Sequence, residues 1–166
     1  MDRTLVIGYG NLDRGDDGVA YYVVNALRQH LGQAPLKEYD TGLEELGTAV
    51  DSIFLTQLMP ELIDTLADYD RVIFIDAHVL PDVPDLHCMS IKPEYSPSAF
   101  THHMTPATLL MLLKSLHQKE PKAYLVSLRG REFDFNRGLS HGTAALLQPA
   151  VEYIKELLAQ KEQGTK

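Results

Sequence analysis

Residues 4–31 read TLVIGYGNLDRGDDGVAYYVVNALRQHL, and they contain the three parts of a βα unit in order. The opening run, TLVIGY, is mostly apolar and predicts a short buried strand. A glycine-rich loop follows, and residues 19–31 then carry apolar side chains at helical spacing. A strand, a loop and a helix in this order indicate a protein built around a parallel sheet.

The same alternation continues along the rest of the chain. We expect further strands at residues 52–58, 71–77, 86–91 and 123–129, and further helices at residues 60–68, 106–117 and 142–160. Residues 33–51 are polar and predict only a short strand near residues 37–40 and a helical turn near residues 43–50. This order predicts the α/β class, as a three-layer α/β/α sandwich with a mostly parallel, mixed sheet of about five strands. Ligands of such folds bind at the carboxyl ends of the strands.

The composition favours one globular domain, residues 1–166, whose last six residues form a polar tail. Hydrophobic residues make up 45% of the chain, which is enough for a sizeable core. No apolar run reaches the roughly 18 residues of a membrane span, and the N-terminus lacks the features of a secretory signal. The single cysteine, Cys88, excludes an internal disulfide, so we expect a cytoplasmic location.

The net charge of −8 limits the classes of partner. Nucleic-acid binding depends on clustered Lys and Arg, so an acidic chain argues against a nucleic-acid partner and, for the same reason, against a membrane surface. An acidic protein can favour a basic substrate segment, although net charge affects association rate more than identity. We expect a monomer.

The loop after the first strand does not match a dinucleotide-binding loop. Gly8 and Gly10 occupy the first two glycine positions of G-x-G-x-x-G, but the third position holds Asp13. Asp16 and Asp17 would repel a pyrophosphate, and the loop contains no P-loop lysine. We therefore do not expect a bound nucleotide.

Two carboxylates are notable for their positions. Asp17 follows Asp16 just before a predicted helix, and Asp76 ends the apolar strand RVIFIDA. In the structural interpretation, one of the adjacent aspartates caps the helix, the other complements its dipole, and Asp76 caps a loop. In the functional interpretation, a carboxylate of the Asp16-Asp17 pair combines with Asp76 at the carboxyl edge of the sheet, because burying Asp76 without a partner would be costly.

Two adjacent histidines, His102 and His103, precede the leucine-rich helix that begins at Pro106. Neighbouring residues on regular structure point in different directions, so at most one of them serves a given site. Two carboxylates and one histidine would form an O/O/N ligand set suited to a divalent transition metal. Spacing alone does not separate this set from two structural histidines.

The other reactive side chains favour structural roles. We expect neither a G-x-S-x-G nucleophile elbow nor an H-E-x-x-H helix, and Cys88 lies on a predicted strand without an evident base partner. Ser140 adjoins His141, but chain neighbours rarely form a nucleophile and base pair, so we interpret Ser140 as the N-cap of the last helix. His78, close to Asp76, is interpreted as a surface histidine.

Several segments together resemble the hydrogenase maturation proteases. Residues 5–27, LVIGYGNLDRGDDGVAYYVVNAL, are similar to the family's G-x-G-N-x-x-x-x-D-D/E-G-x-G signature and first helix. The segments TQLMPELIDTLADYDRVIFIDA, HHMTPATLLMLLKSL and AYLVSLRGREFDFNRGLSHGTAALLQPAV resemble later parts of the family. The first of these is most similar to the branch serving bidirectional or NAD-linked hydrogenases, which tends to read Q-L-T-P-E-L there. The resemblance covers residues 5–158.

The resemblance implies a substrate, a metal and a set of site residues. Family members remove a C-terminal extension from the large-subunit precursor of nickel-iron hydrogenases after nickel has been inserted. They bind nickel through an acidic residue in the first loop, an aspartate after the V-I-F-I-D-A type strand and a histidine before the next helix. Carried over by motif, these are Asp17, Asp76 and His102, as both catalytic residues and metal ligands, with His103 as the alternative histidine. The nickel is expected to be the ion already seated in the substrate.

Two departures from the family pattern are visible. Ala20 replaces the second glycine of D-D-G-x-G, and residues 56–58, TQL, stand where other branches carry a D-G-G-T type loop. Two other functions stay open: a non-catalytic chaperone of the nickel-loaded precursor, and a metal-dependent peptidase acting on another substrate. A chaperone would bind the precursor without changing its mass, whereas a protease would shorten it.

Overall fold

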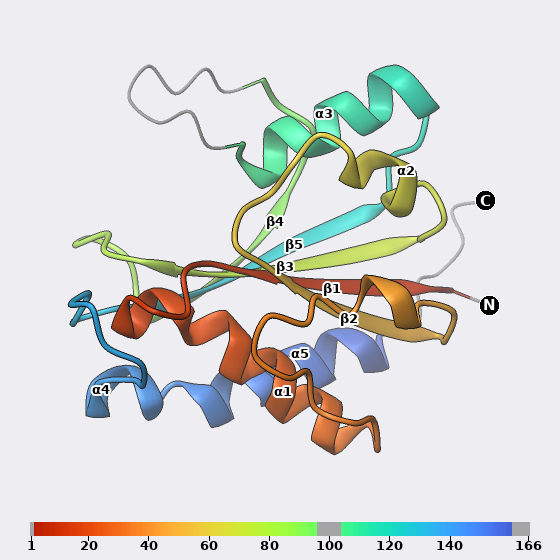
Figure 1. Cartoon of the computed structure of the whole chain (residues 1–166). Coiled ribbons are helices and arrows are strands. Elements are labelled where there is room, and N and C mark those ends of the chain that lie inside the picture. Colours follow the sequence, from red (N-terminus) through yellow and green to blue (C-terminus); the bar gives the residue numbers. More distant parts are fainter. Residues whose placement is uncertain (1, 96–103, 161–166) are drawn as a thin grey trace.

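The computed structural model describes residues 2–95 and 104–160, and within these residues five strands form one sheet (Figure 1). The strands are β1 (Thr4–Tyr9), β2 (Val50–Leu55), β3 (Arg71–His78), β4 (Leu86–Ile91) and β5 (Lys122–Arg129). Their order in the sheet is β2-β1-β3-β5-β4. All neighbouring pairs are parallel except β4 and β5, which are antiparallel. The predicted α/β class with a mostly parallel, mixed sheet is confirmed.

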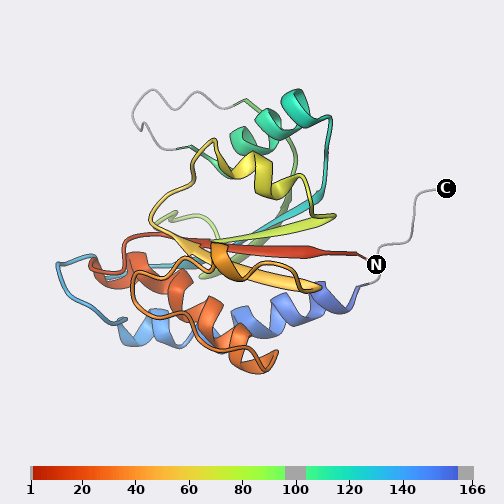
Figure 2. The same ribbon diagram turned by 45° about the vertical axis from the view of Figure 1, so that its right-hand side comes forward.

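Helices cover both faces of the sheet, which gives the expected three layers (Figures 1 and 2). The helices α1 (Val19–His30) and α5 (Leu147–Ala159) pack together on one face. The helices α2 (Leu62–Leu66) and α3 (Pro106–His117) pack together on the other. Three short turns complete the described elements: the 3₁₀ turns η1 (Gly15–Gly18) and η2 (Leu43–Glu45), and the helix α4 (His141–Ala144).

The central strand β3 explains why its sequence is apolar without alternation. Ile73 and Ile75 pack into the core beneath α1 and α5, whereas Phe74 packs into the core beneath α2 and α3. All three side chains have no exposed surface. A strand buried on both faces requires apolar residues at every position. Asp76, near the end of β3, therefore lies where the two cores on either face of the sheet end.

The structure corrects three boundaries. Residues 37–40 form a turn rather than a strand: the Asp40 N–H donates to the Lys37 carbonyl over 3.0 Å, and Tyr39 has a φ of 70°. The helical turn near residues 43–50 is limited to η2, since β2 begins at Val50. The helix expected at residues 142–160 is broken into α4 and α5, because Pro149 has no N–H to donate to the carbonyl four residues earlier.

Two expectations fall on residues that the structure does not describe. The polar tail, residues 161–166, lies outside the described residues, and so do His102 and His103. Among the helices of residues 2–95 and 104–160, none has both the length and the apolar character needed to cross a membrane.

Candidate functional site

Asp76 lies where the carboxyl ends of β1, β3 and β5 meet. The register of the sheet places Asp76 opposite Ser127 on β5 and one position beyond the Ile75–Gly8 pair on β1. The hydroxyl of Tyr9 donates to Oδ2 of Asp76 over 2.9 Å, and the hydroxyl of Ser127 donates to Oδ1 over 2.7 Å. The two neighbouring strands therefore hold the carboxylate in one orientation.

The surroundings of Asp76 oppose its ionisation. Burial raises the pKa of the Asp76 carboxyl above its ordinary value, and the hydrogen bonds from Ser127 and Tyr9 offset this only in part. The negative charge of Asp17 makes a smaller contribution in the same direction. Burial and the neighbouring Asp76 also raise the pKa of the Tyr9 hydroxyl, which keeps it a hydrogen-bond donor. A carboxyl with a raised pKa at a strand end is a typical feature of functional sites.

Asp17 reaches the same edge from the turn η1. Its Oδ2 accepts a 2.8 Å hydrogen bond from the N–H of Asn11, and the side chain of Asn11 accepts a further bond of 2.9 Å from the N–H of Asp13. Gly10 has a φ of +150°, and a Cβ at this position would lie 2.1 Å from the carbonyl oxygen of Asp17. Only glycine fits this close approach of the two loop segments. Asp17 itself remains partly exposed and available to a ligand.

Asp16 has a different role from its neighbour. Its side chain has no exposed surface, and its carboxylate accepts five hydrogen bonds. The donors are the N–H groups of Arg131, Glu132 and Ser140 and the hydroxyls of Ser140 and Thr143, at 2.7–2.9 Å. Asp16 does not cap a helix, because neither η1 nor α1 has a side-chain cap hydrogen bond. It instead fixes the loop between β5 and α4 to η1.

The hydrogen bonds to Asp16 favour its charged form. Burial alone would raise its pKa, but the bonds from Arg131, Ser140 and Glu132 outweigh burial and lower the pKa from 3.8 to about 2. Asp16 is therefore a stabilising carboxylate, whereas Asp76 is held in an unfavourable environment. The two aspartates therefore differ in environment, which their spacing in the sequence does not show.

The third proposed site residue is not placed. His102 and its alternative His103 lie outside the described residues, and only the helix that follows them is seen. Within residues 2–95 and 104–160, no group of three His, Cys, Asp or Glu side chains is arranged to hold a metal ion. The structure thus brings Asp17 and Asp76 to one edge of the sheet, and the role of His102 stays a prediction.

Three further interpretations are settled by the geometry. Ser140 is the N-cap of α4 as expected, and its Oγ accepts the N–H of Thr143 over 3.4 Å. The expectation that the chain lacks a G-x-S-x-G pattern is wrong, because residues 138–142 read GLSHG. The hydroxyl of Ser140 nevertheless donates to Asp16. Burial raises the pKa of the Cys88 thiol to about 11, so it is a poor nucleophile at neutral pH.

His78 is not a surface histidine. Its exposed fraction is 8%, and its Nδ1 accepts the N–H of Leu80 over 3.2 Å. Its Nε2 is buried and has no hydrogen-bond partner among the described residues. The ring contacts His87 edge to face, with 6.5 Å between the ring centroids.

The sequence interpretation missed the two hydroxyls that hold Asp76. Ser127 interrupts the apolar run of β5, which is a visible signal, because a lone serine on a central strand needs a polar partner. Tyr9 occupies the variable position of the G-x-G motif, where the sequence gives no indication of a contact with residue 76.

A cavity of about 610 Å³ opens beside the Asp17 loop. Gly10 and Asn11 line it from the loop that carries Asp17, and Phe54 and Thr56 line it from the end of β2. Asp17 and Asp76 themselves are not among its lining residues. The cavity therefore borders the loop that carries Asp17.

Comparisons with known proteins give one consistent result. The chain is 30% identical over 156 residues to a protein of Methanocaldococcus jannaschii assigned to the hydrogenase maturation proteases, covering 90% of this chain and 92% of that relative. It is 28% identical over 167 residues to the hydrogenase 2 maturation protease of Escherichia coli, covering 98% of this chain and 93% of that relative. No known family profile matches the sequence.

Solved structures show the same similarity. The hydrogenase maturating endopeptidase of Escherichia coli superposes with a TM-score of 0.68 and 26% identity, over 94% of this chain and 91% of that one. A nickel-iron hydrogenase maturation protease of Thermococcus kodakarensis has a TM-score of 0.63 over 95% and 93% of the two chains, and at 20% identity it supports the fold alone.

Proposed function

We propose that this chain, which belongs to the hydrogenase maturation protease family, is an endopeptidase that removes the C-terminal extension of a nickel-iron hydrogenase large-subunit precursor. Family membership rests on the 30% identity to the archaeal relative over 90% of this chain. The relatives named above as a protease and as an endopeptidase support hydrolysis of a peptide bond.

The pairing of Asp17 with Asp76 at the carboxyl edge of the sheet is the observation that best supports this function. Asp17 comes from the loop after β1 and Asp76 from the end of β3, and the charge of one affects the pKa of the other. Two interacting carboxylates beside a cavity can bind a cation and can exchange protons with water. Neither capability is needed for the stability of the fold.

The nickel ion of the precursor is the cation that we propose for this pair. Each carboxylate oxygen carries two lone pairs, so Asp17 and Asp76 can bind a metal while keeping their hydrogen bonds to Asn11, Tyr9 and Ser127. His102 would add a nitrogen ligand, which suits a divalent transition metal. The ion belongs to the substrate in this proposal, so the protease recognises a precursor that has already received nickel.

Two mechanisms are compatible with this arrangement. In the first, the substrate nickel polarises the scissile carbonyl or activates water. In the second, nickel serves only for recognition, and a carboxylate accepts the proton from the attacking water. Asp76 suits this second role because its pKa is raised toward the range of an effective general base. Both mechanisms require Asp17 and Asp76.

We further propose that the chain serves the bidirectional or NAD-linked branch of hydrogenases. Residues 56–62, TQLMPEL, support this because they are similar to the Q-L-T-P-E-L segment of that branch. We also propose that the protein acts in the cytoplasm as a monomer. The single cysteine supports the location, because proteins of oxidising compartments commonly carry disulfides.

Single substitutions test the proposed site. Asp17→Asn, Asp76→Asn and His102→Ala should each abolish shortening of the nickel-loaded precursor, as followed by gel mobility and intact mass. Asp64→Asn is the matched control, because Asp64 lies on α2 and pairs with His117 at the surface, away from the strand ends. Full processing by the three site variants would refute the assignment of these residues. Stable binding without shortening by the unmodified protein would favour the chaperone function.

A further inference from the structure

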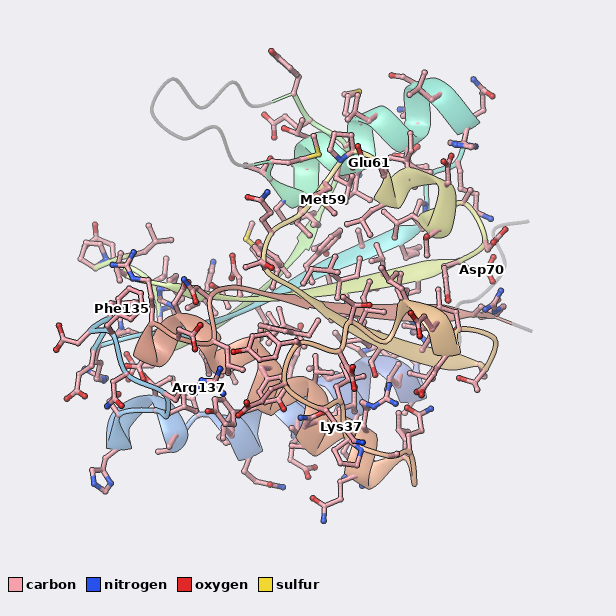
Figure 3. The ribbon with its side chains drawn as sticks, in the orientation of Figure 1. Lys37, Met59, Glu61, Asp70, Phe135 and Arg137 are labelled. Carbon is pink, nitrogen blue, oxygen red and sulfur yellow. The ribbon has the colours of Figure 1, made fainter. Side chains whose placement is uncertain are left out.

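Apolar side chains line much of the cavity beside the Asp17 loop, together with polar ones such as Asp13 and Asp40. The rings of Tyr21 and Phe54, which both line it, make an edge-to-face contact with 5.5 Å between their centroids. Met59, on the segment between β2 and α2, lies at the rim with 41% of its surface exposed (Figure 3). Tyr39 completes the rim on the other side and is 83% exposed. Large apolar side chains left exposed around a concavity of 610 Å³ are typical of a binding site.

A single arginine joins the loops that surround this cavity. Arg137, on the loop between β5 and α4 (Figure 3), donates from Nε to Asp13 over 2.8 Å and from Nη2 to the hydroxyl of Tyr39 over 2.7 Å. Its Nη1 pairs with the carboxylate of Glu38. Asp13 and Tyr39 both line the cavity. The guanidinium thus ties the loop after β1 to the loop before β2 at the outer wall.

The loop that carries Arg137 is itself held at its base. Asp16 accepts bonds from Arg131 and Ser140 at the two ends of this loop, and the N–H of Gly15 donates to the carbonyl of Asn136 over 2.7 Å. Arg137 therefore acts from a fixed position on Tyr39, whose turn has few other constraints and a positive φ of 70°. Without Arg137, the turn that carries Tyr39 would have to become ordered when a ligand binds, and this loss of conformational entropy would weaken binding.

We propose that this cavity binds a large apolar side chain of the substrate peptide next to the scissile bond, and that Arg137 positions its outer wall. The inference rests on the proposed protease function and adds a substrate contact to it. The cavity and Asp17 are linked through Asn11, which lines the cavity and whose N–H donates to Oδ2 of Asp17 over 2.8 Å. This link supports a peptide as the ligand. A substrate that reaches Asp17 would place a neighbouring residue in the cavity.

Binding of a peptide tests the proposal without relying on catalysis. A fluorescently labelled peptide that spans the cleavage region of the precursor would be titrated with the full-length protein and followed by anisotropy. Arg137→Ala and Met59→Glu should each raise its Kd by about tenfold, because one disorders the wall and the other places a charge at an apolar rim. Arg131→Ala is the matched control, since Arg131 lies on the same loop but pairs with Asp85.

A second peptide tests whether a large apolar side chain of the peptide occupies the cavity. Replacing the large apolar residues of the peptide with alanine should weaken binding to the unmodified protein and remove the difference between that protein and Arg137→Ala. Equal Kd values for the unmodified protein, Arg137→Ala and Met59→Glu would overturn the proposal, and so would an equal loss in Arg131→Ala. The nickel-loaded precursor, incubated with the same protein, reports on the protease function separately. The expected Kd changes with an uncleaved precursor would support the cavity while refuting the protease function. A cleaved precursor with unchanged Kd values would refute the cavity while supporting the protease function.

Discussion

The hydroxyl of Tyr9 lies 2.9 Å from Oδ2 of Asp76 and donates a hydrogen bond to it, which joins the ends of two strands separated by 67 positions in sequence. Together with Ser127, this contact orients the Asp76 carboxylate without neutralising it. Partners of this kind fix the direction in which a ligand or a proton can be received.

Removing the Tyr9 hydroxyl should impair cleavage more than folding. Tyr9→Phe keeps the ring but leaves the Asp76 carboxylate oriented by Ser127 alone, so we expect kcat/KM for the nickel-loaded precursor to fall by about tenfold or more. Tyr69→Phe is the matched control: it removes a 2.6 Å bond to Asp51 near the opposite ends of the strands, so it should lower the melting temperature and leave kcat/KM unchanged. Equal effects of the two variants on kcat/KM would contradict the role given to Tyr9.

Substitutions of the adjacent aspartates should have different effects, one on the unfolding free energy and the other on cleavage. Asp16→Asn replaces an acceptor of five hydrogen bonds with a group that must also donate, so it should cost about 1–3 kcal/mol of unfolding free energy. Asp17→Asn should leave the unfolding free energy nearly unchanged and abolish cleavage. Urea unfolding and precursor processing measure the two effects, and a stability loss confined to Asp17→Asn would show that the assignments are reversed.

The stability of the fold should depend on Asp16 at acid pH. Its pKa in the folded protein is about 2, below the ordinary value of 3.8, so its contribution to stability is fully present above pH 3.8 and is lost as the pH falls toward 2. Asp16→Asn should therefore show a shallower decline in unfolding free energy between these pH values than the unmodified protein. Parallel declines, measured by urea unfolding at several pH values, would exclude Asp16 as the source.

The backbone of the first loop should tolerate no side chain at Gly10. In Gly10→Ala the new Cβ would lie 2.1 Å from the carbonyl oxygen of Asp17, so the loop must shift and cleavage should be lost. Gly32→Ala is the control, because Gly32 also has a positive φ of 73° but no atom lies within 4 Å of its added Cβ. That variant should lose some stability and retain its kcat/KM. Normal processing by Gly10→Ala would mean that the loop geometry is not needed.

The parts of the fold that the sequence predicted well are those decided by local pattern. Apolar runs located the strands at residues 4–9 and 86–91, and Pro106 marked the start of α3. Pro149 was an equally local signal for the break between α4 and α5, and the sequence interpretation did not use it. The strand predicted at residues 37–40 was wrong, because these residues form a turn that contacts Arg137, far along the chain.

The site was predictable only in outline for the same reason. The position of Asp76 at the end of a buried strand indicated a place at the sheet edge, which the structure confirms. Asp16 differs from Asp17 because its carboxylate accepts hydrogen bonds from donors more than 110 positions away in the sequence. The spacing of residues in the first loop gives no indication of these donors. The contact of Tyr9 with Asp76 depends on the order of the strands, because only adjacent strands bring these side chains together.

The most direct test is the intact mass of the cognate large-subunit precursor, prepared with and without nickel, after incubation with this protein or with its Asp17→Ala variant. The account predicts loss of a C-terminal peptide only from the nickel-loaded precursor and only with the unmodified protein. An unchanged mass in every sample, or equal shortening by Asp17→Ala, would contradict it.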